Sequence, residues 1–217
     1  MCKDLPQLSL FITLEGPDGS GKTRQAILLS QRLGALNHDV LLTREPGGTE
    51  ISEQIRQVLT SLDNTRMDPR AEFLLFSASR AQHVQERIRP HLDKGGIVVC
   101  DRFFDASLAY QGYGHGLDLD KLREITAFAT QGLVPDLTFL LDLPIEQGLQ
   151  RREQDGNWNR LDAYDLDFHR RVRQGYLSLA KSQPARWVVV DGLQEVDRVH
   201  DEITRVVETR LSRSSST

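Results

Sequence analysis

Residues 10–23 read LFITLEGPDGSGKT, and this stretch decides the fold. Its first six residues, Leu10 to Glu15, form a short apolar run that predicts a buried strand. The next eight match G-x-x-x-x-G-K-[ST], the pattern of a phosphate-binding loop between a strand and a helix. Its glycines let the backbone turn with N–H groups facing an anion, and the following helix adds its positive end.

The loop predicts a nucleotide triphosphate site. Lys22 is expected to reach the β and γ phosphates, and the Thr23 hydroxyl to ligate Mg²⁺. A glycine-rich turn ahead of a helix is the alternative, but the apolar strand before the loop and the helical pattern after it favour the phosphate site. The predicted ATP-binding residues are Gly16, Pro17, Asp18, Gly19, Ser20, Gly21, Lys22 and Thr23.

A phosphate loop alone leaves kinases, GTPase switches, ATPases and several synthetases open. The sequence contains no Asn-Lys-x-Asp guanine signature, which weakens the GTPase alternative. At 217 residues, the chain is also too short for most ATPases with several modules.

Further apolar runs alternate with helical patterns along the chain. Four more strands are expected at 40–43, 97–100, 137–143 and 187–190, and the longer helices at 22–36, 51–62, 69–92 and 118–130. Because these strands are continuously apolar, they predict a parallel sheet covered on both faces. The expected fold is a three-layer α/β fold, with a five-stranded parallel sheet and helices on both faces.

Two polar, glycine-rich stretches interrupt this pattern, at 111–116 and 154–160, and are expected to be connectors or mobile lids. Arg151, Arg152 and Arg160 flank the second one, so it is the better candidate for a lid that closes over phosphates, at about 150–161. A solvated surface run is the alternative. We expect one domain over 1–211 and a disordered tail at 212–217.

Composition excludes several classes of protein. The formal charge of −4 argues against a general nucleic-acid binder, which needs a basic surface. No apolar stretch is long enough to span a membrane, and a cytoplasmic protein is expected. The two cysteines stand alone, so neither a zinc site nor a disulfide framework is predicted.

Charged pairs stand where two expected strands end. In an open parallel sheet, ligands bind at the carboxyl ends of the strands. Asp101 is therefore a candidate to hold Mg²⁺, and Arg102 and Arg44 to hold phosphate. The alternative for Asp101 and Arg102 is a structural ion pair.

Phe73, Phe76 and Arg80 recur at helical spacing and share one helix face. A ring and an arginine on one face would stack on a base and bond its edge. From spacing alone, however, aromatic residues in such a pattern are more often part of the core.

Together these stretches resemble the bacterial thymidylate kinase family. The resemblance runs from about Phe11 to Val190 and is carried best by Arg-Glu-Pro-Gly-Gly-Thr at 44–49, Asp101-Arg102 and Ala-Tyr-Gln-Gly at 109–112. It implies a three-layer α/β P-loop kinase fold with a short lid, and transfer of a phosphoryl group from ATP-Mg²⁺ to dTMP by a homodimer. It also implies dTMP-binding roles for Asp18, Arg44, Phe76, Arg80, Arg102, Ser107, Tyr110 and Gln111, and places Asp101 and Glu45 near Mg²⁺.

The loop interior carries no arginine, and the resemblance then implies that the lid supplies one. Arg160 is the first candidate, with Arg152 and Arg151 as the others. The expected catalytic residues are thus Lys22, Arg102, Arg160 and Arg152. His115 stands where the family often has arginine, and Asn159-Arg160-Leu161-Asp162 replaces the more usual Asp-Arg-x-Glu. Two alternatives stay open: a kinase for another acceptor, and a nucleotide-dependent regulatory protein without transfer activity.

Overall fold

The structure, a computed structural model, describes residues 9–154, 156 and 158–214. Five strands form one sheet in the order β2-β3-β1-β4-β5, and all paired strands are parallel. They are β1 (Leu10–Glu15), β2 (Val40–Arg44), β3 (Ile97–Asp101), β4 (Leu137–Asp142) and β5 (Trp187–Asp191). The predicted five-stranded parallel sheet is confirmed.

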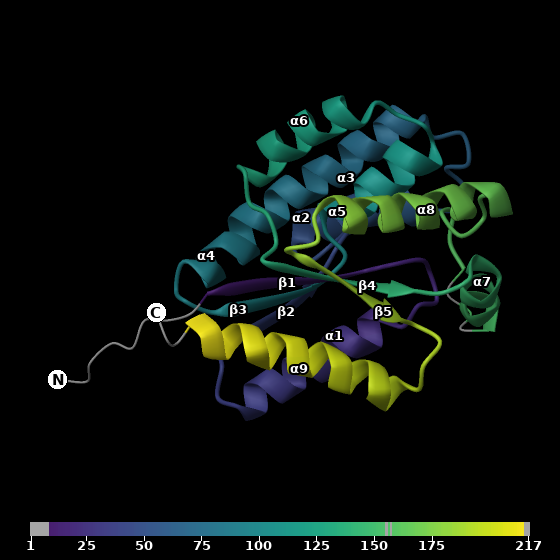
Figure 1. Ribbon diagram of the computed structural model, residues 1–217. Helices are drawn as coiled ribbons and strands as arrows, with labels where there is room; N and C mark the ends of the chain where they lie inside the picture. The colour runs from purple at the N-terminus through teal and green to yellow at the C-terminus, as the bar shows by residue number, and fades with distance from the viewer. Residues whose placement is uncertain (1–8, 155, 157, 215–217) are drawn as a thin grey trace.

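Helices cover both faces of the sheet (Figure 1). One face carries α1 (Lys22–Ala35) and α9 (Val196–Ser214). The other carries α3 (Pro69–His83), α5 (Phe104–Ser107), α6 (Leu119–Thr130) and α8 (Leu166–Ser182). The described helical elements are completed by α2 (Glu50–Thr60), α4 (Arg89–Leu92), α7 (Ile145–Gln154) and two π-helical segments, η1 (Val84–Ile88) and η2 (Leu108–Gly114).

Two apolar cores explain why the strands are continuously apolar. On one side of β1, Ile12 packs in a cluster with Leu29 of α1 and Ile203 of α9. On the other side, Phe11 packs in a cluster with Phe73 of α3 and Tyr176 of α8. Since successive side chains of a strand alternate between faces, both sets must be apolar.

The predicted helix at 69–92 is confirmed as α3, η1 and α4 in direct succession, with η1 π-helical. Two other predictions of local structure need correction. The stretch 111–116, predicted as a connector or lid, belongs mostly to the buried η2. Its glycines serve close packing, because a Cβ at Gly112 would lie 2.4 Å from Leu119 Cδ2 and one at Gly114 would lie 2.6 Å from Phe168 Cε2. The predicted tail is helical through residue 214, and residues 215–217 lie outside the described residues.

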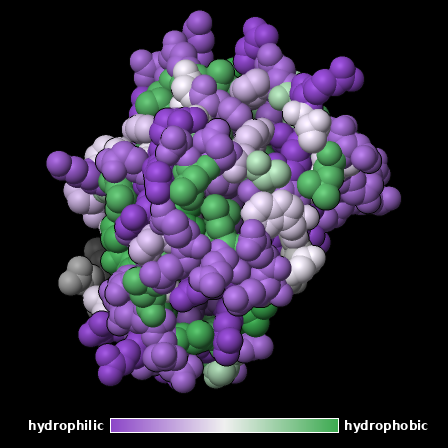
Figure 2. Space-filling view, turned by 90° about the vertical axis from the view of Figure 1, so that its right-hand side faces the viewer, coloured by the Kyte–Doolittle hydropathy of each residue, from purple (hydrophilic) through white to green (hydrophobic). Residues whose placement is uncertain are grey.

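The sheet topology creates a crevice at the carboxyl ends of the strands. The chain leaves β1 for β2 and β3 on one side and then crosses to β4 on the other, and ligands of such sheets bind at this switch point. Figure 2 looks onto this end of the molecule, which is mostly hydrophilic with smaller apolar groups near its middle. Among the described residues, no helix combines the length and apolar character that a membrane span requires.

Candidate active site

The loop between β1 and α1 is shaped by its glycines and by α7. Gly16, Gly19 and Gly21 all have positive φ. A Cβ at Gly19 would lie 2.1 Å from the carbonyl oxygen of Gly148 in α7, so only glycine permits this approach. The loop backbone is thus fixed between the sheet and a helix that also carries Arg151 and Arg152.

Lys22 lies under this loop and is buried. Its Nζ donates to the carbonyl oxygen of Pro17 at 2.6 Å and to the Ser20 hydroxyl at 3.2 Å. Burial, followed by the positive charge of Arg102, lowers the pKa of Lys22 to about 8. An anion bound in the loop would relieve this unfavourable setting.

Thr23 and Asp101 meet where a phosphate-bound cation is expected. The Thr23 hydroxyl donates to Asp101 Oδ2, so a hydroxyl and a carboxylate from two elements converge beside Lys22. The described residues contain no group of three or more His, Cys, Asp or Glu that would hold a metal by themselves. One carboxylate and one hydroxyl fit Mg²⁺, which keeps several waters and takes other ligands from substrate phosphates.

Arg102 is held in place on several sides. Its backbone is left-handed, with φ 68°, and its Nη1 donates to the Gly16 carbonyl oxygen at 3.0 Å and to the Tyr176 hydroxyl at 2.9 Å. Its Nη2 pairs with Asp18 Oδ1 at 2.7 Å, and the Tyr110 hydroxyl donates to the other oxygen of Asp18. Burial alone would raise the pKa of Asp18, but Arg102 and Lys22 hold it well below its ordinary value.

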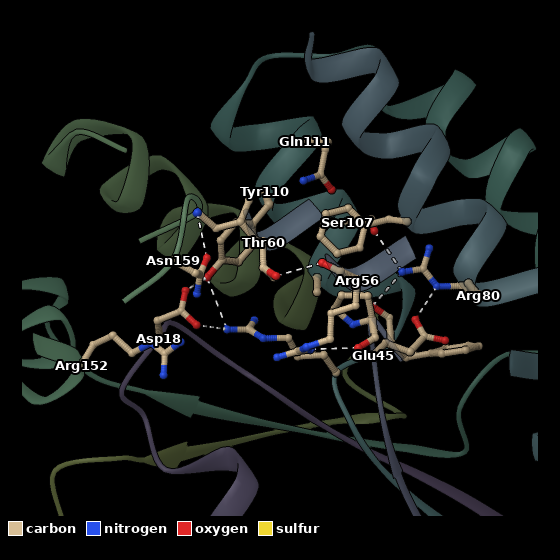
Figure 3. A pocket seen from close by; sticks show the side chains of 16 residues that line it. Asp18, Glu45, Arg56, Thr60, Arg80, Ser107, Tyr110, Gln111, Arg152 and Asn159 are labelled. Atoms are coloured by element: carbon tan, nitrogen blue, oxygen red, sulfur yellow. Dashed lines mark hydrogen bonds and ion pairs between the residues drawn. The ribbon is translucent and has the colours of Figure 1, made fainter. Parts of the chain in front are cut away.

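A cleft opens beside this cluster, and Figure 3 shows its lining side chains. The cleft has a volume of about 630 Å³, part of which is open to solvent, and this size suits a small molecule. Phe73 is buried in the core, whereas the half-buried Phe76 lines the cleft, so two aromatic residues of one helix have different roles. The predicted residues that line it are Asp18, Phe76, Arg80, Arg102, Ser107, Tyr110 and Gln111.

Arg80 is the largest fully buried side chain among the described residues. Its Nε donates to Glu45 Oε2 at 2.8 Å and its Nη2 to the Ser107 hydroxyl at 3.0 Å, while its Nη1 has no partner among the described residues. The other oxygen of Glu45 lies 3.1 Å from His83 Nδ1. Glu45 lines the opening around the loop together with Thr23 and Asp101, and its two oxygens anchor Arg80 and His83. Its expected place near Mg²⁺ stays a prediction.

Two arginines lie between the cleft and the loop. Arg44, predicted from the sequence, pairs with Glu53 Oε1 at 2.9 Å and lines the wider opening around the loop. Arg56 was not predicted; it donates to the Pro46 carbonyl oxygen at 2.9 Å and lines both openings. Its spacing from Glu53 and Thr60 places the three residues on one face of α2, but the spacing does not say that this face borders the cleft.

The structure separates the three candidate lid arginines. Arg160 is buried, with Nη2 2.6 Å from Glu72 Oε2 and Nε donating to the Leu59 carbonyl oxygen at 3.0 Å, and it lines neither opening. Arg152 lines both openings, and Arg151 lines the one around the loop. The geometry therefore favours Arg152 and Arg151 over Arg160 as groups that face phosphates. Residues 155 and 157 of the predicted lid lie outside the described residues.

A further hollow, missed from the sequence, lies between the loop and the start of α9. Its lining includes Arg24 and Gln25 of α1 together with Gln194 from the segment after β5. It adjoins the loop through Ser20 and Gly21, so it is placed to take the nucleoside end of a loop-bound nucleotide. Its residues carry no motif, and only the fold brings them together.

The described residues therefore bring together a triphosphate loop, a cation-compatible oxygen pair, several arginines and a cleft with a ring and buried polar groups. Comparison with known proteins agrees with this combination. The family model described as thymidylate kinase matches residues 14–203.

Individual relatives match nearly the whole chain. A thymidylate kinase from Roseiflexus sp. is 50% identical over 94% of this chain and 96% of its own length. One from Deinococcus radiodurans is 52% identical over 93% and 97%. The crystal structure of thymidylate kinase from Ehrlichia chaffeensis matches with a TM-score of 0.77 at 36% identity, over 93% of this chain and 99% of that one. This chain belongs to the thymidylate kinase family.

Proposed function

We propose that this protein transfers the γ-phosphoryl group of ATP to thymidylate, forming ADP and dTDP for dTTP biosynthesis. The main observation behind the proposal is that the phosphate-loop opening and the cleft share lining residues. Asp18 and Arg102 line both the opening around the phosphate loop and the cleft with Phe76 and Arg80. A donor on the loop and an acceptor in the cleft would thus face each other across Arg102.

The proposed roles follow from position and charge. Lys22 holds the β and γ phosphates of ATP, and Arg102, Arg44 and Arg56 hold the phosphate of thymidylate. Phe76 stacks on the base, whose edge faces Arg80, Ser107 and Gln111. Asp18 and Tyr110, which share a hydrogen bond, lie beside the sugar.

Phosphoryl transfer requires mainly that the two substrates are aligned and that the charge of their phosphates is neutralised. The acceptor oxygen of thymidylate is already anionic, so no strong general base is needed. Mg²⁺ bound with ATP, held by Thr23 and Asp101, would neutralise phosphate charge. Arg102 is held by several hydrogen bonds before substrate arrives, so it needs little reorganisation as the phosphoryl group moves.

The direct test is product analysis. Purified protein is incubated with ATP, Mg²⁺ and dTMP, and the nucleotides are separated and quantified by chromatography. Equal amounts of ADP and dTDP are expected. ADP without dTDP would contradict the proposal and favour a nucleotide-hydrolysing regulatory protein.

Replacement of Phe76 with alanine is expected to weaken dTMP binding by about 5- to 150-fold and to leave ATP binding nearly unchanged, because stacking on a base contributes about 1–3 kcal/mol. Calorimetric titration with each nucleotide measures both affinities. Leu36→Ala is the control, because this apolar side chain just after α1 is 42% exposed and lines neither the cleft nor the opening around the loop. Equal weakening of both nucleotides by Phe76→Ala would make Phe76 a packing residue.

Substitution of Arg152 is expected to affect the rate, whereas substitution of Arg160 is expected to affect stability. Arg152→Ala is expected to lower kcat by about 10²- to 10³-fold, the usual effect of removing one charge-stabilising donor. Arg160→Ala is expected instead to lower the unfolding free energy by about 3–5 kcal/mol, because it leaves the buried Glu72 without its ionic partner. Steady-state rates and thermal denaturation separate the two effects. A normal kcat in Arg152→Ala would move the role to Arg151.

A homodimer, located in the cytoplasm, is part of the proposal. Leu74 on α3 and Phe128 on α6 are exposed apolar side chains on two helices that lie side by side (Figure 1). Burial of such side chains in a partner would be favourable. Light scattering of the purified protein would give twice the mass of the chain if this is right, and the mass of one chain if it is wrong.

A further inference from the structure

The carboxylate of Glu72 on α3 is fully buried at the centre of a polar cluster. Gln111 Nε2 of η2 donates to its Oε1 at 2.6 Å. The Tyr164 hydroxyl donates to Oε2 at 2.9 Å, and Arg160 Nη2 lies 2.6 Å from the same oxygen. His115 Nε2 is more distant, at 3.5 Å from Oε1. One carboxylate therefore ties the wall of the cleft to the segment that follows α7.

Glu72 stays charged in this setting. Burial raises its pKa, but His115, Arg160 and Gln111 together lower it to about 2. An ionised carboxylate only accepts hydrogen bonds, so the atom of Gln111 that faces it at 2.6 Å must be the NH₂ group. The oxygen and the nitrogen of the Gln111 amide have nearly the same shape, and the charge of Glu72 determines which of them faces it.

The orientation of Gln111 decides what the cleft offers to a ligand. With Nε2 on Glu72, the carbonyl Oε1 is buried without a partner among the described residues, and the Gln111 amide points into the cleft (Figure 3). Arg80 Nη1 is likewise buried and unpaired, and Arg80 lines the same cleft. The cleft therefore presents one fixed acceptor and one fixed donor.

These two groups distinguish pyrimidines. Thymine and uracil carry a ring N3–H donor next to the O4 acceptor, which matches an acceptor and a donor. Cytosine has a bare N3 acceptor next to an N4 amino donor, which mismatches both. Unpaired buried polar groups are expensive, so a site of this kind rejects the wrong edge strongly.

We propose that Glu72 is a positioning residue for specificity: it fixes the amide of Gln111 so that the cleft accepts bases with a ring N–H and rejects cytosine. This inference rests on the proposed function, since it concerns the nucleotide that occupies the acceptor cleft. Glu72 does not touch the base and acts through Gln111.

The test is the ratio of kcat/KM for dTMP to that for dCMP. This ratio is independent of the fraction of protein that is folded. In the wild type it is expected to be about 10⁴ or larger. Glu72→Gln allows the facing amide to turn over, and it is expected to lower the ratio by about tenfold or more. Part of the selectivity remains because Arg80 still mismatches cytosine.

A double-mutant cycle tests whether Glu72 affects specificity through Gln111. Gln111→Met alone should also lower the ratio, and adding Glu72→Gln to it should cause no further loss. Tyr164→Phe is the matched control, because it removes one hydrogen bond to Glu72 but keeps the charge and the bond to Gln111. Its ratio is expected to stay within about twofold of the wild type.

If Glu72→Gln proves too unstable, the pair Glu72→Gln/Arg160→Met removes both buried charges, with Arg160→Met as its control. An unchanged ratio in the Glu72 variants, or independent effects in the double mutant, would overturn the inference while normal dTMP turnover upholds the proposed function. A wild-type protein that does not phosphorylate dTMP would overturn both.

Discussion

Lys22→Ala is expected to lower kcat by about 10³-fold without loss of the fold. The ammonium is held by the Pro17 carbonyl oxygen and the Ser20 hydroxyl inside the phosphate loop, where a preorganised charge contributes most to the transition state. No other lysine lines the opening around the loop, within the part of the chain that the structure describes.

The same substitution should not lower the stability of the folded protein. The folded state lowers the pKa of Lys22 from 10.5 to about 8, chiefly through burial, so the charged form is disfavoured on folding. This penalty is present in full below pH 8 and disappears as the pH rises toward 10.5. At neutral pH, the Tm of Lys22→Ala should therefore equal or exceed that of the wild type.

Rate assays and thermal denaturation at pH 7 measure the two effects, with Lys181→Ala at an exposed site as the control. A kcat within tenfold of the wild type would remove Lys22 from the mechanism. A collapse of Tm would instead make it a structural residue.

Arg102→Met is expected to lower kcat/KM for dTMP by about 10³- to 10⁵-fold, the range found for arginines that stabilise a transferring phosphoryl group. Arg102 joins the Gly16 carbonyl oxygen, Asp18 and Tyr176, so its charge lies at the junction of the two openings. Arg102→Lys should restore only part of the activity, because an ammonium cannot reproduce the planar fork of donors.

The loss of Arg102 also leaves Asp18 without its ionic partner, so a lower Tm is expected as well. Arg123→Met, which removes a half-exposed arginine paired with Asp120 on α6, is the matched control for the loss of one positive charge. Arg102→Met with kcat/KM within tenfold of the control would show that other groups neutralise the acceptor phosphate.

Much of the fold follows from local sequence. The strand-loop-helix at 10–36 and the continuously apolar strands predict a parallel sheet because backbone geometry and burial act within a few residues. The same holds for Lys22 and Asp101, whose places are fixed by the ends of buried strands.

The failures concern side chains whose direction depends on distant partners. Arg160 was expected to face phosphates because it flanks a polar loop. Instead its side chain is buried and contacts Glu72 and the Leu59 carbonyl oxygen, both of which are far away in the sequence. The contacts of Glu45 with Arg80 and His83 of α3 could likewise not be derived from the sequence. Arg56 was missed because only the packing of α2 beside the loop reveals which of its faces borders the cleft.

An acceptor panel tests the central claim most directly. Purified protein with ATP and Mg²⁺ is assayed with dTMP, dUMP, dCMP, AMP, GMP and thymidine, and kcat/KM is determined for each. We predict the highest value for dTMP, with dCMP, the purines and the unphosphorylated nucleoside far lower. If one of these compounds is converted readily while dTMP is left unchanged, the assignment of the cleft to thymidylate is wrong.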